Sequence, residues 1–149
     1  MSDTDRIKIL LVGPKENGKT GIANYLGGLS TELNSLTKPT IGVRIVEFER
    51  NGLKLVKQKA IQRDGKVMVE LWDVSGDKIF QQCWPAIIKD THGVLIVYNP
   101  DSRNAEKELD FWHKAFASKI KDSCCLVFAH HQDEEAAKNA TKLRMIQLH

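Results

Sequence analysis

The sequence predicts an α/β fold, with a mostly parallel, doubly wound central sheet and helices on both faces. Strand-length apolar runs alternate along the chain with segments of helical spacing, and this order requires parallel strands joined by right-handed crossovers. The expected strands are residues 6–12, 43–49, 66–71, 93–98, 124–129 and 142–148. A chain of 149 residues suits one core, so we expect residues 1–149 to form a single domain.

The first strand and the first helix are separated by a glycine-containing loop. Arg6–Val12 is apolar and β-branched, as expected of a buried strand, and it ends at Gly13. Lys19–Leu26 has helical character, and it stops at Gly27–Gly28, a signal that ends helices. The start of the chain therefore predicts a strand, a loop and a helix in that order.

Two later runs alternate apolar and polar residues, which is typical of half-buried strands. These runs, residues 43–49 and 66–71, are expected to pair as an antiparallel hairpin. Residues 50–65 between them form a long polar segment with Asn51–Gly52 and Asp64–Gly65 as turn signals. We therefore expect this segment to be a connection rather than part of the strands.

The second half of the chain continues the alternation of strands and helices. Residues 105–117 are expected to be helical, with Leu109, Trp112 and Phe116 at helical spacing. This aromatic stripe predicts core packing rather than a binding surface. The following strand, 124–129, begins with adjacent cysteines that would face opposite sides of the sheet.

Composition narrows the class of protein. The net charge of +3 comes from 22 basic and 19 acidic residues that are dispersed along the chain, so no nucleic-acid partner is expected. Three cysteines without a secretory signal indicate a reducing, cytoplasmic compartment, with the thiols in or near the core. The apolar runs are too short to cross a bilayer and lipidation signals are lacking, so no direct membrane anchor is expected.

The loop after the first strand matches the pattern G-x-x-x-x-G-K-[ST] from Gly13 to Thr20. Glycines at its two ends allow the backbone to wrap around a polyphosphate, so that successive N–H groups point inward. Lys19 would reach the β- and γ-phosphates, Thr20 would bind Mg²⁺, and the helix N-terminus would favour the anion. A chance match is disfavoured because the motif follows a strand and opens a helix. The predicted phosphate-binding residues are Gly13, Lys15, Glu16, Asn17, Gly18, Lys19 and Thr20.

Two further segments carry residues suited to a nucleotide site. Asp73 ends an apolar strand, where its carboxylate can hold Mg²⁺ through water, and Gly76 leaves room for its N–H to meet a γ-phosphate. Thr40 lies in the loop before the strand 43–49, where its hydroxyl can ligate Mg²⁺ and its backbone can sense the γ-phosphate. Each motif alone could be an ordinary turn, and their order after the phosphate loop favours a joint site.

The order G-x-x-x-x-G-K-T, T-I-G-V and W-D-x-x-G-x-x-x-F resembles the Ras superfamily, and Rab and Rab-like proteins most of all. The resemblance implies a small-GTPase fold, with Thr40 in switch I and with Asp73, Gly76 and Phe80 in switch II. Residues 42–49, 83–86 and 128–131 are similar to Rab-like GTPases of the intraflagellar transport B complex.

This resemblance also implies ligands, partners and a place in the cell. The ligands would be GTP or GDP with Mg²⁺, and the partners would be coiled-coil subunits of the transport complex. The protein would act in the cytoplasm and at the cilium or flagellum and its base. The family pattern continues with a final helix after the last strand, so the domain is expected to lack that helix and to expose apolar surface.

The catalytic positions depart from the family pattern. Asp77 stands where most Ras-like proteins carry the glutamine that orients the attacking water. Lys15 occupies a position that is glycine in Ras, where it either crowds the catalytic geometry or supplies a charge to the phosphates. With Thr40 and Gly76, Asp77 completes the candidate catalytic set, and the two departures together predict slow hydrolysis.

The base-reading motif N-K-x-D appears as residues 130–133. Asp133 retains the carboxylate that can accept two protons from guanine, which favours guanine over adenine. His130 and His131 replace the asparagine and the lysine, and they either pack beside the loop or stack on the base.

Three functions remain as hypotheses. The first is a GTP-binding scaffold subunit with slow turnover, and the alternative is a cycling GTPase that regulates ciliary or vesicle traffic. A P-loop kinase or ATPase is disfavoured, because Asp133 selects guanine and no arginine-rich lid is visible. Ile41, Phe80 and Trp84 are candidates for partner anchors, with core packing as the equal alternative for Phe80 and Trp84.

Overall fold

The computed structural model describes residues 5–32, 37–53, 56–57, 60–61 and 65–131. Its main sheet has five strands in the order β2-β5-β1-β6-β7, and β2 is antiparallel to the other strands. These strands are β1 (Asp5–Val12), β2 (Val43–Leu53), β5 (Gly65–Val74), β6 (Gly93–Tyr98) and β7 (Cys125–Ala129). The expected mostly parallel sheet is confirmed. The strand expected at 142–148 lies outside the described residues.

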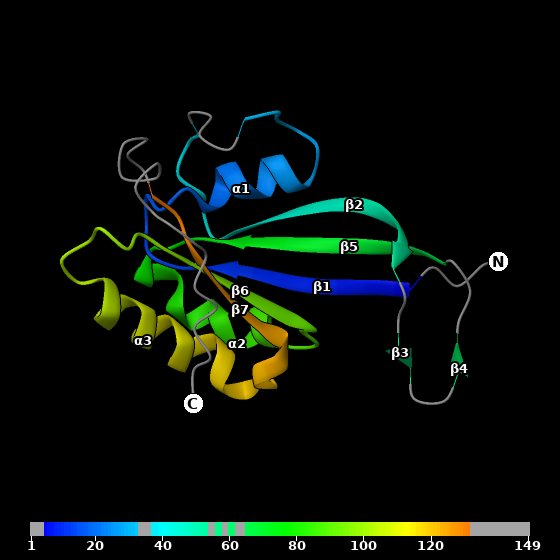
Figure 1. Ribbon diagram of the computed structural model, residues 1–149. Coiled ribbons are helices and arrows are strands. Elements are labelled where there is room, and N and C mark those ends of the chain that lie inside the picture. Colours follow the sequence, from blue (N-terminus) through cyan, green and yellow to red (C-terminus); the bar gives the residue numbers. More distant parts are fainter. Residues whose placement is uncertain (1–4, 33–36, 54–55, 58–59, 62–64, 132–149) are drawn as a thin grey trace.

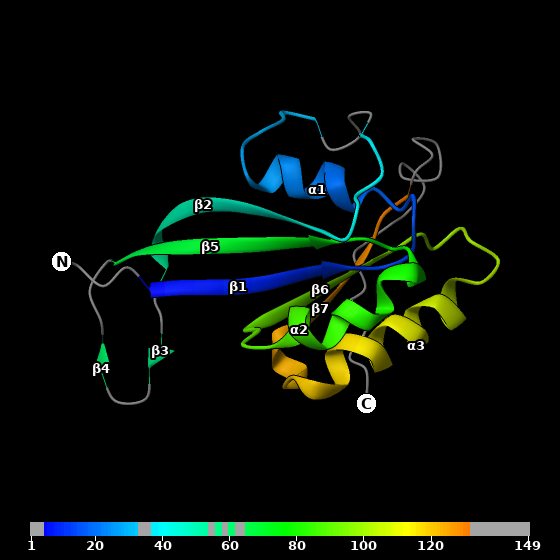
Figure 2. The same ribbon diagram turned by 180° about the vertical axis from the view of Figure 1, so that it is seen from behind.

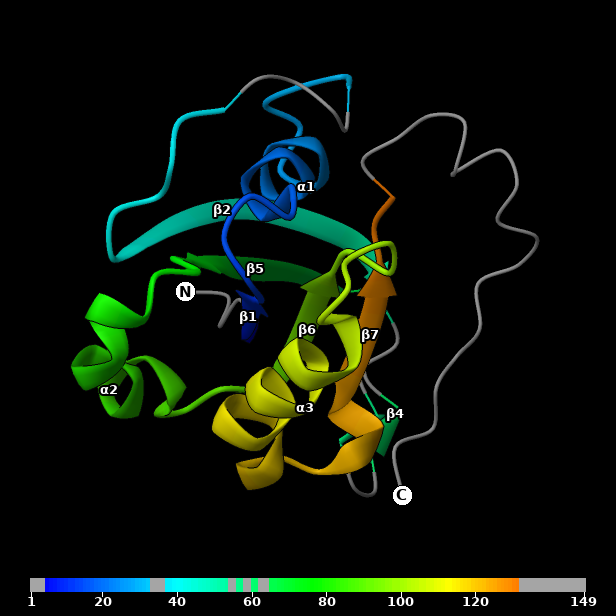
Figure 3. The ribbon, with the colours of Figure 1, turned by 90° about the vertical axis from the view of Figure 1, so that its left-hand side faces the viewer.

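Helices cover both faces of this sheet, as Figures 1 and 3 show. One face carries α1 (Lys19–Leu26), and the other carries α2 (Trp84–Ile88) and α3 (Ala105–Phe116). Three short 3₁₀ helices, η1 (Lys78–Cys83), η2 (Ala117–Lys119) and η3 (Asp122–Cys124), complete the helical elements of the described chain. Within the described ranges, no helix is long and apolar enough to cross a membrane.

The expected hairpin between β2 and β5 is confirmed, with Val43 opposite Val74 and Arg50 opposite Val67. The expectation that residues 50–65 form only a connection is wrong at both ends. β2 continues to Leu53 and two short strands, β3 (Val56–Lys57) and β4 (Ala60–Ile61), pair antiparallel beyond it. The Asn51–Gly52 signal falls at a register shift in β2, so the strand accommodates it as a bulge-like irregularity.

The β3–β4 hairpin lies at the end of the sheet where β1 begins, away from the loop that follows β1 (Figures 1 and 2). The carboxyl end of β1, where that loop starts, lies at the opposite end of the sheet. The inserted hairpin is therefore separated from the residues that the sequence assigns to nucleotide binding.

Side chains alternate across β1, so the sheet has a core on each face. Leu10 and Val12 pack with the aromatic residues of α2 and α3, whereas Leu11 packs on the side of α1. Trp112 and Phe116 are fully buried, which confirms that the aromatic stripe of α3 belongs to the core. These two cores fix the sheet against both layers of helices.

The positions and the burial of the cysteines differ from the sequence-based expectation. Cys124 closes η3 by donating its backbone N–H to the Lys121 carbonyl oxygen at 2.8 Å, so β7 starts one residue later, at Cys125. The prediction of adjacent cysteines on opposite faces of one strand is therefore wrong. Cys83 and Cys124 are exposed and Cys125 is half-buried, so the predicted core location holds only in part.

Candidate nucleotide-binding site

The loop between β1 and α1 has a backbone shape that its glycines permit. Gly13 has a φ of 146° and Gly18 a φ of 79°, both in the region that favours glycine. A Cβ at Gly13 would collide with the carbonyl oxygen of Val97, so the loop passes closely over β6. Glu16 also adopts the left-handed region, with a φ of 60°. Left-handed residues in such a turn direct successive N–H groups into a nest that binds anions.

Two buried polar side chains lie within this loop. Lys19 is buried, and its Nζ donates to the Pro14 carbonyl oxygen at 2.6 Å. Burial lowers the pKa of Lys19 to about 8, and the charge of Asp73 opposes that shift. The buried Asn17 Nδ2 has no hydrogen-bond partner within the described part of the chain. Because an anion would stabilise the buried ammonium group, the loop fits a phosphate.

Three side-chain oxygens meet beside Lys19. Thr20 Oγ1 lies 2.8 Å from Thr40 Oγ1, and these hydroxyls donate to Asp73 Oδ2 at 2.8 Å and 3.1 Å, respectively. Asp73 is fully buried, and its Oδ1 has no partner among the residues that the structure describes. Hydroxyl and carboxylate oxygens are the hard ligands that Mg²⁺ prefers, so this donor set fits Mg²⁺.

Arg44 is a site residue that sequence reasoning missed. It lies opposite Asp73 in the register of β2 and β5, and its Nη2 is 3.6 Å from Asp73 Oδ2. The same Nη2 donates to Asn24 Oδ1 on α1 at 2.7 Å. The alternation of residues 43–49 marks Arg44 as polar, but only the register of the hairpin places its cation beside Asp73.

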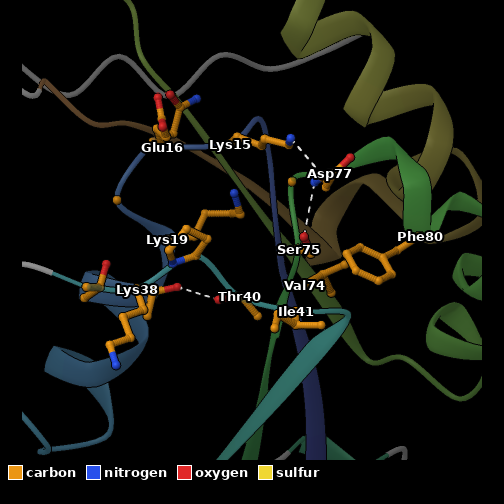
Figure 4. A pocket seen from close by; sticks show the side chains of 16 residues that line it. Lys15, Glu16, Lys19, Lys38, Thr40, Ile41, Val74, Ser75, Asp77 and Phe80 are labelled. Carbon is orange, nitrogen blue, oxygen red and sulfur yellow. Dashed lines mark hydrogen bonds and ion pairs between the residues drawn. The ribbon is translucent and has the colours of Figure 1, made fainter.

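Switch II touches the phosphate loop at Gly76. A Cβ there would collide with the loop backbone from Gly13 to Lys15. The next residue, Asp77, forms an ion pair between its Oδ2 and Lys15 Nζ at 2.8 Å (Figure 4). The hydrogen bond from Lys15 and another from the Ile79 N–H lower the pKa of the Asp77 carboxyl, so it is ionised at neutral pH.

The phosphate loop, switch I and switch II together line a cavity of about 600 Å³ (Figure 4). Its size lies within the range of small-molecule sites. The predicted residues in its lining are Lys15, Glu16, Asn17, Gly18, Lys19, Thr20, Thr40, Gly76 and Asp77. Gly13 contacts this lining at Gly76 and Asp73 at Thr20, so the structure brings together the phosphate and metal residues that the sequence identified.

The two histidines take different positions. His130 is buried, and a Cβ at Gly18 would lie 2.9 Å from its Nε2, so the imidazole supports the phosphate loop from behind. Burial lowers the pKa of His130, which favours the neutral ring. His131 Nδ1 lies 2.9 Å from Asp101 Oδ2. This arrangement favours packing beside the loop for His130, whereas Asp133 lies outside the described residues.

The three candidate partner anchors differ in how deeply they are buried. Trp84 is buried in the core of α2 and α3, so its proposed role as a surface anchor is wrong. Phe80 is half-buried at the cavity, and Ile41 remains 83 % exposed in switch I. Ile79 in switch II is 77 % exposed, and the sequence analysis did not single it out.

Fold and site together define a P-loop domain of the small-GTPase class. The family model of the Ras of Complex, Roc, domain of DAPkinase matches residues 8–133. The chain is 41% identical over 134 residues to the intraflagellar transport protein 22 homolog of Danio rerio, a match covering 89% of this chain and 69% of that protein. The chain therefore belongs to the Roc family of Ras-like domains and to the intraflagellar transport protein 22 family.

Other relatives agree with this assignment. Intraflagellar transport protein 22 of Trypanosoma brucei is 34% identical over 146 residues, covering 88% of this chain and 66% of that protein. The GTP-bound crystal structure of T. brucei IFT22/74/81 matches with a TM-score of 0.66 and 29% identity, over 94% of this chain and 77% of that chain. The GDP-bound T. brucei IFT22 structure matches with a TM-score of 0.60 and 32% identity, over 87% and 66%. The chain thus spans about two thirds of the length of its relatives.

Proposed function

We propose that this chain binds GTP and GDP with Mg²⁺ and serves as a slowly hydrolysing subunit of the intraflagellar transport B complex. The observation that carries the proposal is the meeting of Thr20, Thr40 and Asp73 beside the buried Lys19. One cavity thereby combines a phosphate nest, a buried cation and a hard-oxygen cluster, which is the combination that a magnesium–nucleotide complex requires.

Each group has a distinct role in this proposal. Lys19 contacts the β- and γ-phosphates, and the loop N–H groups bind the remaining phosphate oxygens. Thr20, Thr40 and Asp73 would hold Mg²⁺. The N–H of Gly76 meets the terminal phosphate, and Asp133 selects guanine. Bound Mg²⁺ would neutralise phosphate charge, while the protein residues orient the nucleotide.

The relatives support the partner and nucleotide classes. Structures of T. brucei IFT22 carry GTP or GDP, and a further structure contains IFT22 with 74 and 81. By analogy, this chain presents its switches to coiled-coil subunits of the transport complex, in the cytoplasm and at the cilium or flagellum. The alternative of a cycling GTPase differs in its rate of hydrolysis, which is a measurable quantity.

The test is the identity of the nucleotide that co-purifies with the protein, measured by chromatography of an acid extract. We expect guanine nucleotide from the natural sequence and a loss of at least about tenfold in Lys19→Ala and Thr20→Asn, because each removes a charged or metal contact. Lys114→Ala, which removes an exposed lysine of α3 paired with Asp110, serves as the matched control. Adenine nucleotide, or full retention in both site variants, would contradict the proposal.

A further inference from the structure

The ion pair between Lys15 and Asp77 joins the phosphate loop to switch II across the cavity. Both side chains line the cavity and point toward one another in Figure 4, with 2.8 Å between Nζ and Oδ2. The two residues flank the place where Gly76 touches the loop backbone. The pair therefore spans the contact between the two segments that enclose this end of the cavity.

One carboxylate serves two elements here. Asp77 Oδ2 accepts from Lys15, while Asp77 Oδ1 accepts from the Ile79 N–H at 3.1 Å and caps η1. The Asp77 N–H in turn donates to Ser75 Oγ at 3.2 Å. The start of η1 is thus connected through a single side chain to a cation of the phosphate loop.

The pair lies next to Gly76, whose N–H is expected to meet the terminal phosphate. His130 packs behind Gly18 and is followed by the base-reading segment, whereas Lys15 faces switch II. A nucleotide lying between these ends would direct its outermost phosphate toward Lys15 and Asp77. A diphosphate is one phosphate shorter, so it would leave the pair undisturbed.

The charges make the pair exchangeable. Lys15 and Asp77 are 60% and 38% exposed, and ion pairs of this kind contribute little in water because the partners are solvated. A terminal phosphate carries more negative charge than one carboxylate, so it competes well for the Lys15 ammonium group. The freed Asp77 is then repelled by the same phosphate.

We propose that Lys15 exchanges Asp77 for the terminal phosphate of a bound nucleoside triphosphate, which makes this pair the discriminator between triphosphate and diphosphate states. The proposal rests on the proposed binding of guanine nucleotide. Lys15 is thereby a specificity residue, and the released Asp77 carries the nucleotide state to η1, where the exposed Ile79 lies.

The experiment compares affinities for GDP and a non-hydrolysable GTP analogue by titration calorimetry with Mg²⁺ present. In Lys15→Gln we expect the ratio of triphosphate to diphosphate affinity to fall by roughly tenfold, the value of a lost charge-assisted hydrogen bond. Lys15→Arg retains the charge and should keep the ratio near that of the natural sequence. Asp77→Asn should raise the ratio several-fold, since it removes both a competitor for Lys15 and a repulsive charge.

Lys78→Gln is the matched control. This substitution removes a lysine charge next to Asp77. The Lys78 ammonium group lies over the Phe111 ring, 4.1 Å from the centroid, so the ratio of triphosphate to diphosphate affinity should not change. An unchanged ratio in Lys15→Gln, or an equal loss in Lys15→Arg, would overturn the exchange. A lower ratio in Asp77→Asn would also overturn it, by showing that Asp77 holds Lys15 in place. If the natural sequence binds neither nucleotide, the proposed function fails as well, which separates the two outcomes.

Discussion

The hydrogen atom on the α-carbon of Gly76 allows the backbone of switch II to touch the phosphate loop. A methyl group in its place would collide with the backbone of Pro14 and Lys15. We expect Gly76→Ala to lower affinity for a GTP analogue by roughly tenfold, because overpacking of this kind costs about 1–3 kcal/mol. Calorimetry measures the affinity, and Gly93→Ala, whose Cβ would meet only Cys124 O at 3.3 Å, is the control. Equal affinities in both variants would contradict the close contact.

The residue at position 77 also determines the expected rate of GTP hydrolysis. Asp77 holds an anionic carboxylate at the position where the family orients water with a glutamine. We expect the chain alone to hydrolyse GTP more slowly than about 10⁻² per second, the range of intrinsic rates in this class. Single-turnover assays measure the rate directly. A rate near one per second would favour the cycling enzyme over the slow scaffold subunit.

Local sequence motifs were sufficient to predict some residues of the site and insufficient to predict others. Lys19 and Thr20 follow from one contiguous motif, because the loop and the helix start fix their positions. Arg44 reaches Asp73 only through the antiparallel register of β2 and β5, which no single motif encodes. The pairing of Lys15 with Asp77 likewise depends on how two loops approach each other in space.

At the level of secondary-structure elements, Trp84 and Ile87 bury α2 against the core, and Trp84 is the larger of the two. Trp84 contacts Phe116 and Trp112, with ring centroids 4.8 Å and 5.1 Å apart, and its Nε1 is buried without a partner among the described residues. Trp84→Ala should reduce the free energy of unfolding by about 3–5 kcal/mol, because it leaves a cavity. Trp84→Phe should cost less than Trp84→Ala, since it keeps an aromatic ring and removes the unpaired N–H.

Urea unfolding at equilibrium measures both Trp84 variants. A loss below about 1 kcal/mol in Trp84→Ala would contradict its place in the core and favour the alternative of a partner anchor. The core position was not evident from sequence, because an aromatic residue in a switch segment suits both an anchor to the core and an anchor to a partner. The structure separates the two by placing Trp84 against the stripe of α3.

Strand ends were also harder to predict than strands. The pattern of alternation identified β2 and β5, but it ended β2 at residue 49, whereas the strand continues to Leu53. The Asn51–Gly52 pair favours a turn in isolation, and cross-strand pairing on both sides of it overrides that preference. Cross-strand pairing thus determines where β2 ends, whereas the local alternation of apolar and polar residues is enough to predict that a strand is present.

At the level of the whole molecule, each of the two switch segments lines the nucleotide cavity and also exposes an apolar side chain. Ile41 in switch I is 83 % exposed and Ile79 in switch II is 77 % exposed. Apolar anchors of this kind contribute strongly when a partner buries them. Because Ile41 lines the cavity and the backbone N–H of Ile79 donates to Asp77, the position of each side chain would change with the bound nucleotide.

We expect Ile41→Ser and Ile79→Ser to abolish co-purification with the partner subunits of the transport complex, while the melting temperature stays unchanged. Nucleotide content should stay unchanged in Ile79→Ser, because Ile79 does not line the cavity. Exposed side chains contribute little to the folded core, so a polar substitution at either site should not affect stability. Leu29→Ser is the matched control, since Leu29 is 66 % exposed just after α1, outside the switches. If both isoleucine variants still bind the partners, the interface lies elsewhere. If Leu29→Ser alone loses them, the surface beside α1 is the docking face.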